Sequence, residues 1–394
     1  MNILVLNSGS SSIKYQLFDM DDRTVVAAGL IERIGEQASR HVHRTAAGVD
    51  EPDPAPVGDH DDGFRRIVAA IDAGDGAPLG AVGHRVVHGG PAFSSATVLD
   101  GGVIERIRAQ TPLAPLHNPA NLRGIEVAYA LRPDLPQVAV FDTAFHAGMP
   151  AAATRYALPT EVADAHGIRR YGFHGTSHAY VARRAAEHLG RPASDCDLIT
   201  LHLGNGASAT AVAGGVSVDT SMGLSPLAGL VMGTRSGDVD PAVVFHLIRV
   251  AGMTPDEVEE MLNRRSGLKG LCGDNDMREV ERRAAAGEAD AEVALELYCY
   301  RIRSYIGAYL AVLGGADAIV FTGGIGEHSP TVRSRACAGL QPLGIAVDAA
   351  RNDARAEGGI TDVTAADAAV RVLVVPTDEE LEIAEQTLAC VAPG

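Results

Sequence analysis

Two arginines and one aspartate stand where the sequence predicts buried strand or tight turn. Arg85 lies inside an apolar stretch expected to be a strand, and Arg235 lies in a glycine-flanked turn. Because arginine is rarely buried unless its charge is paired, Arg85 is either half of a structural ion pair or a ligand for an anion. Arg235 is either a solvated loop cation or a second such ligand. Asp142 ends a predicted strand, Val138–Phe141, at the edge where a parallel sheet usually places its site. It could orient a nucleophile, bind Mg²⁺ or cap the next segment.

Two histidines, His174 and His178, are four residues apart. A zinc-protease helix is not indicated, because a Gly rather than a Glu follows the first His. Thr176 or Ser177 is a typical N-cap, and the helix it would begin is expected to run to about Leu189. His174 is therefore expected just ahead of a helix N-terminus, a place suited to anions. His178 is expected to pack structurally.

Three glycine-rich turns follow short apolar strands. Segments 3–12 and 198–208 share one plan, a strand followed by a Gly/Ser turn and a second strand, and Lys14 follows the first turn. A third strand, 319–321, leads into glycines at 323–326. Backbone N–H groups and hydroxyls in such turns can hold phosphate oxygens. The Walker and protein-kinase signatures are absent, so nucleotide binding would need another architecture.

The elements that must position these residues alternate between strand and helix, which favours an α/β fold. The strand–turn–strand plan recurs about half the chain apart, which predicts two similar α/β domains; a chance likeness of two hairpins is the alternative. Thr254 opens a capping box, and Ala289–Leu313 is expected to be one long helix closed by Gly314. Residues 40–62, with several Pro and Asp, are expected to form an exposed loop.

Composition limits the function further. The chain has 394 residues, 46% of them hydrophobic and 21% charged, and a formal net charge of −17. This acidity argues against nucleic acid or an anionic membrane as the main partner, although a few cations in one cleft can still bind small anions. The five cysteines form no C-x-x-C pair, and neither a signal peptide nor a membrane-length apolar run is found. We therefore expect a soluble cytoplasmic protein.

Taken together, eight motifs in this order resemble the acetate kinase (acetokinase) family, and the resemblance covers nearly the whole chain. That family belongs to the superfamily of acetate and sugar kinases, Hsp70-type chaperones and actin. The motifs are N-S-G-S-S-S-x-K (7–14), G-H-R-V-V-H-G-G (83–90), P-L-H-N-P (115–119), F-D-T-A-F-H (141–146), Y-G-F-H-G-T-S-H (171–178), H-L-G-N-G (202–206), G-T-R-S-G-D-x-D-P (233–241) and G-G-I-G-E (323–327).

The resemblance implies a fold and an activity. The expected fold is α/β, with two duplicated ribonuclease H-like (actin-like ATPase) domains and an interdomain cleft. The implied domains are 1–145 plus 380–394 for the acyl substrate and phosphate, and 146–379 for the nucleotide. The implied reaction is reversible, direct in-line transfer of a phosphoryl group from ATP to acetate, giving ADP and acetyl phosphate. The partners implied are acetate or acetyl phosphate, ATP or ADP, Mg²⁺ (with Mn²⁺ as a substitute) and a second copy in a homodimer.

The resemblance also assigns roles to matching positions. The implied catalytic residues are Asp142, Arg85, His174 and Arg235. The implied nucleotide-binding residues are Ser10, Ser12, Lys14, His202, Leu203, Gly204, Asn205, Gly206, Asp276, Met277, Arg278, Gly324, Ile325, Gly326, Glu327 and His328. The acyl substrate would contact Arg85, Val87, Leu116, His117, Phe173 and Pro226. The metal would be linked to Asn7 and Glu379.

Three departures from the family pattern stand out. Asp378 replaces the usual Asn in T-N-E-E, which makes the metal ligation less certain. Ala228 ends S-P-L-A where T-P-L-E is common, and His328 stands where Asn is frequent. We expect none of the three to abolish activity.

The chemistry itself favours an electrostatic role for Asp142. The family usually assigns this residue to proton transfer, but a carboxylate acceptor has a pKa near 4 and needs no general base at pH 7. An anionic acceptor and a polyphosphate repel each other, so two Arg, a His and Mg²⁺ would act by positioning and charge neutralisation.

Three alternatives remain at this point. The first is a propionate or other short-chain fatty acid kinase with the same machinery, because one methylene is worth only about 1–3 kcal/mol in an apolar pocket. The second is a non-catalytic nucleotide-binding regulator, which the joint presence of the catalytic residues argues against. The third is an actin-like filament protein, which would need no acyl-site residues.

Overall fold

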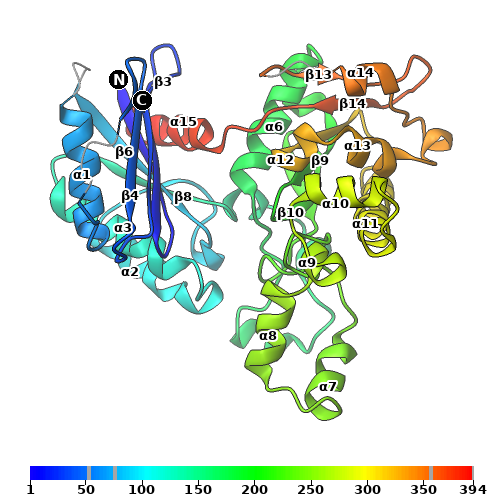
Figure 1. Cartoon of the computed structure of the whole chain (residues 1–394). Coiled ribbons are helices and arrows are strands. Elements are labelled where there is room, and N and C mark those ends of the chain that lie inside the picture. Colours follow the sequence, from blue (N-terminus) through cyan, green and yellow to red (C-terminus); the bar gives the residue numbers. More distant parts are fainter. Residues whose placement is uncertain (51–54, 74–77, 355–357, 393–394) are drawn as a thin grey trace. The chain divides into compact units, whose positions relative to one another are not determined.

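The computed structural model describes residues 1–50, 55–73, 78–354 and 358–392. The chain forms two compact units (Figure 1). Unit 1 comprises Met1–Ala147 and Asp378–Gly394, and unit 2 comprises Gly148–Thr377. None of the helices in these described ranges has both the length and the apolar character needed to cross a membrane.

Unit 1 is built on a mixed sheet with the strand order β5-β4-β3-β2-β1-β6-β8-β7. Strands β1, β6 and β8 are parallel, and β2 and β3 extend the sheet in antiparallel fashion from β1. The strands are β1 (Asn2–Ser8), β2 (Ser12–Asp19), β3 (Thr24–Glu32), β4 (Arg40–Thr45), β5 (Gly48–Asp50), β6 (Leu79–Val86), β7 (Thr97–Val98) and β8 (Gln137–Phe141).

Helices cover both faces of this sheet. Alternate residues of β1 point to opposite faces, as a strand requires: Leu4 and Leu6 pack in the core beneath α1 and α3, whereas Ile3 and Val5 pack against Ile383 of α15. Figure 1 shows α15 in red beside the blue strands, so the last helix of the chain completes the unit that the first strand begins. The helices are α1 (His60–Asp72), α2 (Gly101–Ala109), α3 (Asn118–Leu131) and α15 (Glu379–Val391), with 3₁₀ turns η1 (Gly90–Ala92), η2 (Thr111–Leu113) and η3 (Ala144–His146).

Unit 2 repeats the plan of unit 1. Its sheet has the order β11-β10-β9-β12-β14-β13, with β9, β12 and β14 parallel and β10 and β11 antiparallel. In both units the first strand therefore lies between an antiparallel pair on one side and two parallel strands on the other, which confirms the expected duplication. The strands are β9 (Asp197–Leu203), β10 (Ala207–Ala213), β11 (Val216–Thr220), β12 (Ala318–Thr322), β13 (Thr361–Asp362) and β14 (Arg371–Val374).

The helices of unit 2 confirm the strongest local signals in the sequence. Thr254 and Glu257 form the reciprocal capping box, and the 25-residue helix α11 ends at Gly314 in the left-handed conformation. The helices are α4 (Ala151–Thr154), α5 (Thr160–Ala165), α6 (Gly175–His188), α7 (Pro241–Arg249), α8 (Pro255–Arg264), α9 (Gly267–Cys272), α10 (Met277–Ala285), α11 (Ala289–Leu313), α12 (Gly323–His328), α13 (Pro330–Cys337) and α14 (Ala349–Asp353), with 3₁₀ turns η4 (Ala193–Asp195) and η5 (Gln341–Leu343).

Two local expectations are wrong. Residues 40–62 are not one loop, because β4, β5 and the start of α1 lie within them; residues 51–54 fall outside the described ranges. The cause is a set of contacts between residues that are distant in the sequence. His41 and His43 both hydrogen-bond to Tyr15 Oη in the core, and periodicity over a few residues does not reveal such contacts. Helix α6 begins at Gly175, so its N-cap is His174 rather than Thr176 or Ser177.

Candidate active site

The carboxyl ends of the parallel strands in unit 1 bring three predicted residues to one edge of the sheet. Asn7 lies near the end of β1, Arg85 is the penultimate residue of β6, and Asp142 follows β8 directly. Each continues the alternation of its strand that faces α15, since Val5 and Val140 pack on that face. The sheet therefore gathers an amide, a guanidinium and a carboxylate on the side covered by α15.

Arg85 and Asp142 form a two-point ion pair. Arg85 Nε donates to Asp142 Oδ1 at 3.0 Å, and Arg85 Nη2 donates to Oδ2 at 2.7 Å. The Asp142 side chain is 2% exposed and that of Arg85 is 22% exposed. Burial disfavours the guanidinium charge, but the carboxylates of Asp142, Glu379 and Glu380 outweigh it and raise the pKa of Arg85. Asp142 thus fixes one edge of a permanently charged fork, and the edge bearing Nη1 is directed away from that carboxylate.

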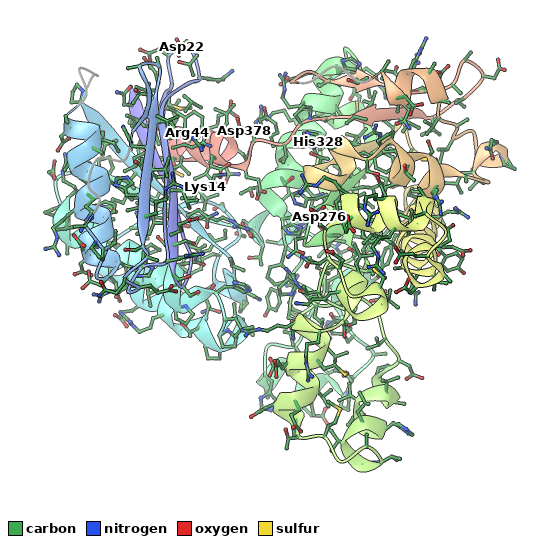
Figure 2. All side chains as sticks on the ribbon, viewed as in Figure 1. Lys14, Asp22, Arg44, Asp276, His328 and Asp378 are labelled. Carbon is green, nitrogen blue, oxygen red and sulfur yellow. The ribbon has the colours of Figure 1, made fainter. Side chains whose placement is uncertain are left out.

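The first Gly/Ser turn joins β1 to β2 and carries Ser10, Ser12 and, on β2, Lys14. Ser10 is exposed, and the turn is closed by the bond from Gly9 N to Ser12 O at 2.8 Å. Lys14 forms an ion pair with Glu380 at the start of α15, and Figure 2 labels both Lys14 and the neighbouring Asp378. Serine hydroxyls, turn amides and an ammonium group are the donors that hold phosphate oxygens.

The departure at Asp378 has a structural explanation. Asp378 is the N-cap of α15, and its carboxylate accepts from Leu381 N at 2.9 Å. Asn and Asp serve about equally well at an N-cap, so the substitution leaves the helix start intact. Burial raises the pKa of Asp378 above its usual value, although the bond from Leu381 opposes this. Asp378 therefore has a capping function that requires no metal.

Asn7 and Glu379 supply the two oxygen donors assigned to a metal. Asn7 is half-buried at the end of β1, and Glu379 is the first residue of α15, close enough to Arg85 to influence its charge. The described residues contain no group of three or more His, Cys, Asp or Glu side chains arranged to hold a metal ion. An amide and a carboxylate oxygen still fit Mg²⁺, which usually takes one or two protein ligands and completes its shell with water and phosphate.

In unit 2, His174 occupies a strained position at the start of α6. Its φ of 57° is one of three positive values among the described residues other than glycine. Its ring stacks on that of His202, with centroids 4.2 Å apart, and its Nδ1 lies 2.9 Å from Ser208 Oγ. A Cβ added at Gly206 would lie 3.3 Å from His174 Nε2 and 3.2 Å from Arg235 Nη2. Both nitrogens therefore converge on the glycine turn that follows β9.

Arg235 is held by a backbone carbonyl. Its Nη1 donates to Pro226 O at 2.6 Å, and burial lowers its pKa from the usual value. In contrast to Arg85, whose charge is compensated by carboxylates, Arg235 is held mainly by a neutral acceptor. An anion beside it would therefore gain more from the interaction than one beside a compensated arginine.

The turn 203–206 that follows β9 is shaped around Asn205. Gly204 N bonds to Gly206 O at 2.9 Å, and Gly233 N bonds to Asn205 O at 3.0 Å. A side chain at Gly233 would collide with Asn205 Oδ1, because an added Cβ would lie 1.9 Å from it. Asn275 Nδ2 donates to the same oxygen at 3.2 Å. Asn205 thus joins two loops, while Leu203 remains fully buried.

The residues assigned to the adenosine side lie in two places in unit 2. Asp276 caps α10 and receives a two-point ion pair from Arg278, with Nε to Oδ1 at 3.0 Å, and Met277 is buried. The glycine run forms the short helix α12, where His328 Nδ1 lies 2.9 Å from Gly324 O. Figure 2 labels Asp276 and His328. The remaining assigned residues of α12 are Ile325, Gly326 and Glu327.

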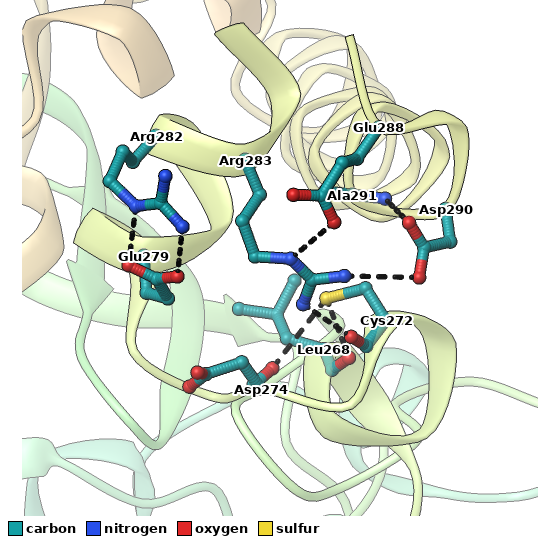
Figure 3. A network of polar contacts seen from close by, with 9 residues as sticks. All are labelled: Leu268, Cys272, Asp274, Glu279, Arg282, Arg283, Glu288, Asp290 and Ala291. Carbon is teal, nitrogen blue, oxygen red and sulfur yellow. Dashed lines mark hydrogen bonds and ion pairs between the residues drawn. The ribbon is translucent and has the colours of Figure 1, made fainter. Parts of the chain in front are cut away.

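Arginine side chains hold both of these segments in place, namely the loop before α10 and the helix α12. Arg283 donates to Cys272 O at 2.6 Å, to Glu288 at 2.8 Å and to Asp290 at 3.2 Å, and these bonds tie the end of α9 to the start of α11 (Figure 3). Cys272 precedes the loop that leads to α10, so this network fixes where that loop begins.

The second brace lies beneath α12. Arg333 is 1% exposed, and its Nη1 donates to both Gly326 O and Glu327 O at 2.9 Å. Its Nε donates to Asn352 Oδ1 at 2.6 Å. A buried guanidinium therefore satisfies the carbonyls at the end of α12 and holds the glycine turn in place.

The residues assigned to the acyl pocket come from both units. In unit 1, Val87 is half-buried, whereas His117 is exposed and Leu116 is 55% exposed. In unit 2, Phe173 is buried and Pro226 is half-buried.

Several supporting residues carry no motif that predicts them. Asn121 of α3 accepts from Val87 N at 3.1 Å and donates to Ser8 O at 2.7 Å, so one side chain joins the ends of β1 and β6. Ser208 and Thr200 are fully buried hydroxyls within apolar strands. The signal that could have found them is a polar residue on the buried face of a predicted element.

The comparisons with known proteins agree with this geometry. The sequence profile of the acetokinase family matches residues 2–385. The acetate kinase of Streptomyces griseus subsp. griseus is 59% identical over 396 residues, covering 99% of this chain and 96% of that protein. The acetate kinase of Syntrophobacter fumaroxidans is 54% identical over 401 residues, covering 99% and 97%.

Solved structures give the same result. The acetate kinase of Porphyromonas gingivalis superposes with a TM-score of 0.93 at 42% identity, covering 99% of both chains. A propionate kinase of Francisella tularensis subsp. tularensis superposes with a TM-score of 0.92 at 41% identity, covering 99% of this chain and 100% of that one. A profile match over nearly the full length, together with relatives of this identity and coverage, shows that the chain belongs to the acetokinase family.

Proposed function

We propose that this protein is an acetate kinase, which transfers the γ-phosphoryl group of ATP to acetate and gives ADP and acetyl phosphate reversibly. The observation that carries the proposal is the convergence of Arg235 Nη2 and His174 Nε2 beside Gly206. Two donors aimed at one point of a glycine turn suit the oxygens of a phosphoryl group in transfer.

The reaction does not require a covalent bond between the protein and the transferred group. A carboxylate oxygen of acetate attacks the γ-phosphorus in line, the bond from phosphorus to the ADP oxygen breaks, and no proton has to move. Arg85 binds the acceptor carboxylate with the edge of its fork that Asp142 does not occupy. Asp142 orients that fork, and Arg235 and His174 bind the phosphoryl oxygens. No phosphoenzyme is required.

We assign the acetate carboxylate and the metal to unit 1 and the nucleotide to unit 2, and the methyl group of acetate to Val87 and Leu116 of unit 1 and Phe173 and Pro226 of unit 2. Asn7 and Glu379 would hold Mg²⁺, which in this position supplies neutralisation of phosphate charge. In unit 1 the phosphate oxygens would accept hydrogen bonds from Ser10, Ser12 and Lys14. In unit 2 they would accept them from the turn around Asn205. The braced segments at 276–278 and 324–328 support adenosine binding.

A second candidate activity is the phosphorylation of propionate. The Francisella tularensis protein named a propionate kinase is as similar in fold as the Porphyromonas gingivalis acetate kinase, so the fold does not separate the two substrates. The 58–59% identities to Streptomyces acetate kinases favour acetate.

The direct test is hydroxamate formation from ATP with acetate, propionate and butyrate as separate acceptors, with Mg²⁺ or Mn²⁺ present. We expect kcat/KM to be highest for acetate and to fall with each added methylene. Higher kcat/KM for propionate would favour the second activity, and no turnover with any of the three acids would overturn the proposal.

We also infer a homodimer that forms through α7. This helix is apolar over most of its length, yet none of its residues is buried within the chain, and Val243 and Phe245 are exposed. The flanking Val239 and Val250 are exposed as well. An apolar helix is normally covered, and a second copy offers the same mostly apolar surface, on which Arg249 lies over the Phe245 ring. Such a surface suits a chain whose net charge of −17 opposes contact elsewhere.

The thiols fit a reducing compartment. Cys196, Cys272, Cys299 and Cys337 are buried and unbridged, and burial raises the pKa of Cys299 and Cys337 to about 12. Such cysteines are packing residues, so we place the protein in the cytoplasm.

A further inference from the structure

A chain of hydrogen bonds runs from His174 into the core of unit 2. His174 Nδ1 lies 2.9 Å from Ser208 Oγ, which lies 2.8 Å from His178 Nε2. His178 Nδ1 lies 2.7 Å from Thr200 Oγ1. Ser208, His178 and Thr200 are all 0% exposed. Because an unmatched buried polar group is costly, the hydrogens along this chain must be arranged consistently.

We propose that Ser208, His178 and Thr200 are positioning residues that set the tautomer of His174, an inference that rests on the proposed function. To donate to a phosphoryl oxygen, His174 must carry a hydrogen on Nε2. Arg235 Nη2 and this nitrogen approach the same point beside Gly206, and two positive charges so close would repel each other. In the neutral ring that results, Nδ1 has no hydrogen and must accept one.

This requirement fixes the direction of every bond in the chain. The Ser208 hydroxyl donates to His174 Nδ1, so its oxygen is left to accept from His178 Nε2. With its hydrogen on Nε2, His178 must accept at Nδ1, and the Thr200 hydroxyl is the donor. Reversing one bond alone would place two hydrogens or two lone pairs face to face in a buried network. Thr200, on the central strand β9, thereby determines which nitrogen of His174 faces the phosphoryl group as a donor.

The ring is held in its plane as well as in its tautomer. His202 stacks on His174 at an interplanar angle of 28°, and His202 Nδ1 lies 2.7 Å from Ser177 Oγ. Ser177 Oγ in turn lies 2.8 Å from Thr377 Oγ1. His174 is therefore supported by stacking on one side and by the Ser208 chain at its inner nitrogen.

The test uses Thr200→Val, which removes the donor at the far end of the chain with little change in shape. Complete loss of a transition-state donor costs about 10²–10³ in kcat, and a weakened preference for the right tautomer should cost roughly 3–10-fold. KM for acetate should stay within about twofold, because the acetate carboxylate is assigned to Arg85 and Thr200 lies at the far end of the hydrogen-bond chain from His174. Thr200→Ser keeps the hydroxyl and should restore wild-type kcat.

The matched control is Thr210→Val. Thr210 pairs with Thr200 in the β9–β10 register and is also 0% exposed, but its hydroxyl bonds to Thr220 Oγ1 at 2.9 Å. The Thr210→Val substitution therefore removes a buried hydroxyl next to the hydrogen-bond chain and leaves that chain intact. If Thr200→Val lowers kcat no more than Thr210→Val does, the positioning role is wrong.

A spectroscopic readout separates this inference from the proposed activity. In ¹⁵N-histidine spectra of the full-length protein, with the signal assigned by its loss in His174→Gln, His174 should carry its hydrogen on Nε2. Thr200→Val should shift its two ring nitrogens toward an average of both tautomers. A hydrogen on Nδ1 in the wild type would overturn the inference whether or not the protein phosphorylates acetate. Failure with all short-chain acids, together with the expected spectra, would overturn the proposed activity alone.

Discussion

Arg85 and Arg235 differ in how their charges are compensated, and this sets their roles. The charge of Arg85 is compensated by Asp142, whose two bonds also fix the orientation of the guanidinium group. Arg235 donates to the neutral carbonyl of Pro226, so most of its positive charge remains available to attract an anion. Arg85 would thus act mainly through orientation, and Arg235 mainly through attraction.

Replacing either arginine by Ala should lower kcat by roughly 10²–10⁴, on the scale of lost charge-stabilising donors. Arg→Lys should recover only part of this, because an ammonium cannot copy the two-point geometry that Arg85 uses with Asp142. The measurement is steady-state turnover, with circular dichroism as the control for folding. Near-normal turnover in both Ala variants would refute the roles assigned to the two residues.

A substitution at Val87 tests whether this side chain lines the acyl pocket. Val87→Ala removes two methyl carbons, and burying one extra CH₂ of a longer acid yields about 0.8 kcal/mol. The ratio of kcat/KM for propionate over acetate should therefore rise roughly fourfold per methylene, with KM for ATP nearly unchanged. If the melting temperature falls while this ratio stays at the wild-type value, Val87 only packs at the end of β6 and is not part of the pocket.

At the scale of elements, the start of α15 combines a cap with functional carboxylates. Asp378→Asn keeps an N-cap, and Asp378→Ala loses about 1 kcal/mol of helix stability. The pKa of Asp378 is raised, so its ionised form is disfavoured in the folded state. The contribution of Asp378 to the free energy of unfolding therefore falls as the pH rises through that pKa.

Asp378→Asn should therefore be at least as stable as the wild type at pH 7, and its advantage should shrink on acidification. The Mg²⁺ concentration for half-maximal activity should not change, since the carboxylate caps a helix. Urea unfolding and Mg²⁺ titration of turnover measure the two effects. A large change in Mg²⁺ dependence would make Asp378 a metal ligand instead.

The packing of β6 predicts a second pH effect. His84 is buried, and burial lowers its pKa to about 4 although the bond to Gln137 opposes this. The unfolded chain, with a histidine pKa near 6.5, binds the proton better, so stability is present above that pH and is lost as pH falls from about 6.5 to about 4. The loss attributable to His84 is on the order of 3 kcal/mol.

His84→Gln should make the urea midpoint less dependent on pH over this range. His166→Gln, at an exposed position, is the control and should leave the dependence as in the wild type. An unchanged slope in His84→Gln would mean that other groups account for the acid instability.

At the scale of the whole molecule, α7 should determine the oligomeric state. Phe245 is 54% exposed on this helix, and a carboxylate there would be buried in a dimer at a desolvation cost that pairing with the nearby Arg249 would offset only in part. Phe245→Glu should shift the protein from dimer to monomer in sedimentation velocity, whereas Val216→Glu, at an exposed strand residue elsewhere in unit 2, should not. A dimer that persists in Phe245→Glu at low concentration would place the interface on another surface.

The sequence by itself determined those features whose causes are local. The capping box at Thr254, the helix Ala289–Leu313 with its terminal Gly314 and the repeated strand–turn–strand plan could all be predicted, because caps, glycine stops and periodicity act over a few residues. The ordered motifs likewise named the candidate site residues. Tertiary structure alone decided their side-chain partners: Asp142 meets Arg85 across 57 positions of sequence, and Ser208 on another element links the ring of His178 to the ring of His174. Such pairings depend on strand register and helix packing, which short-range patterns do not encode.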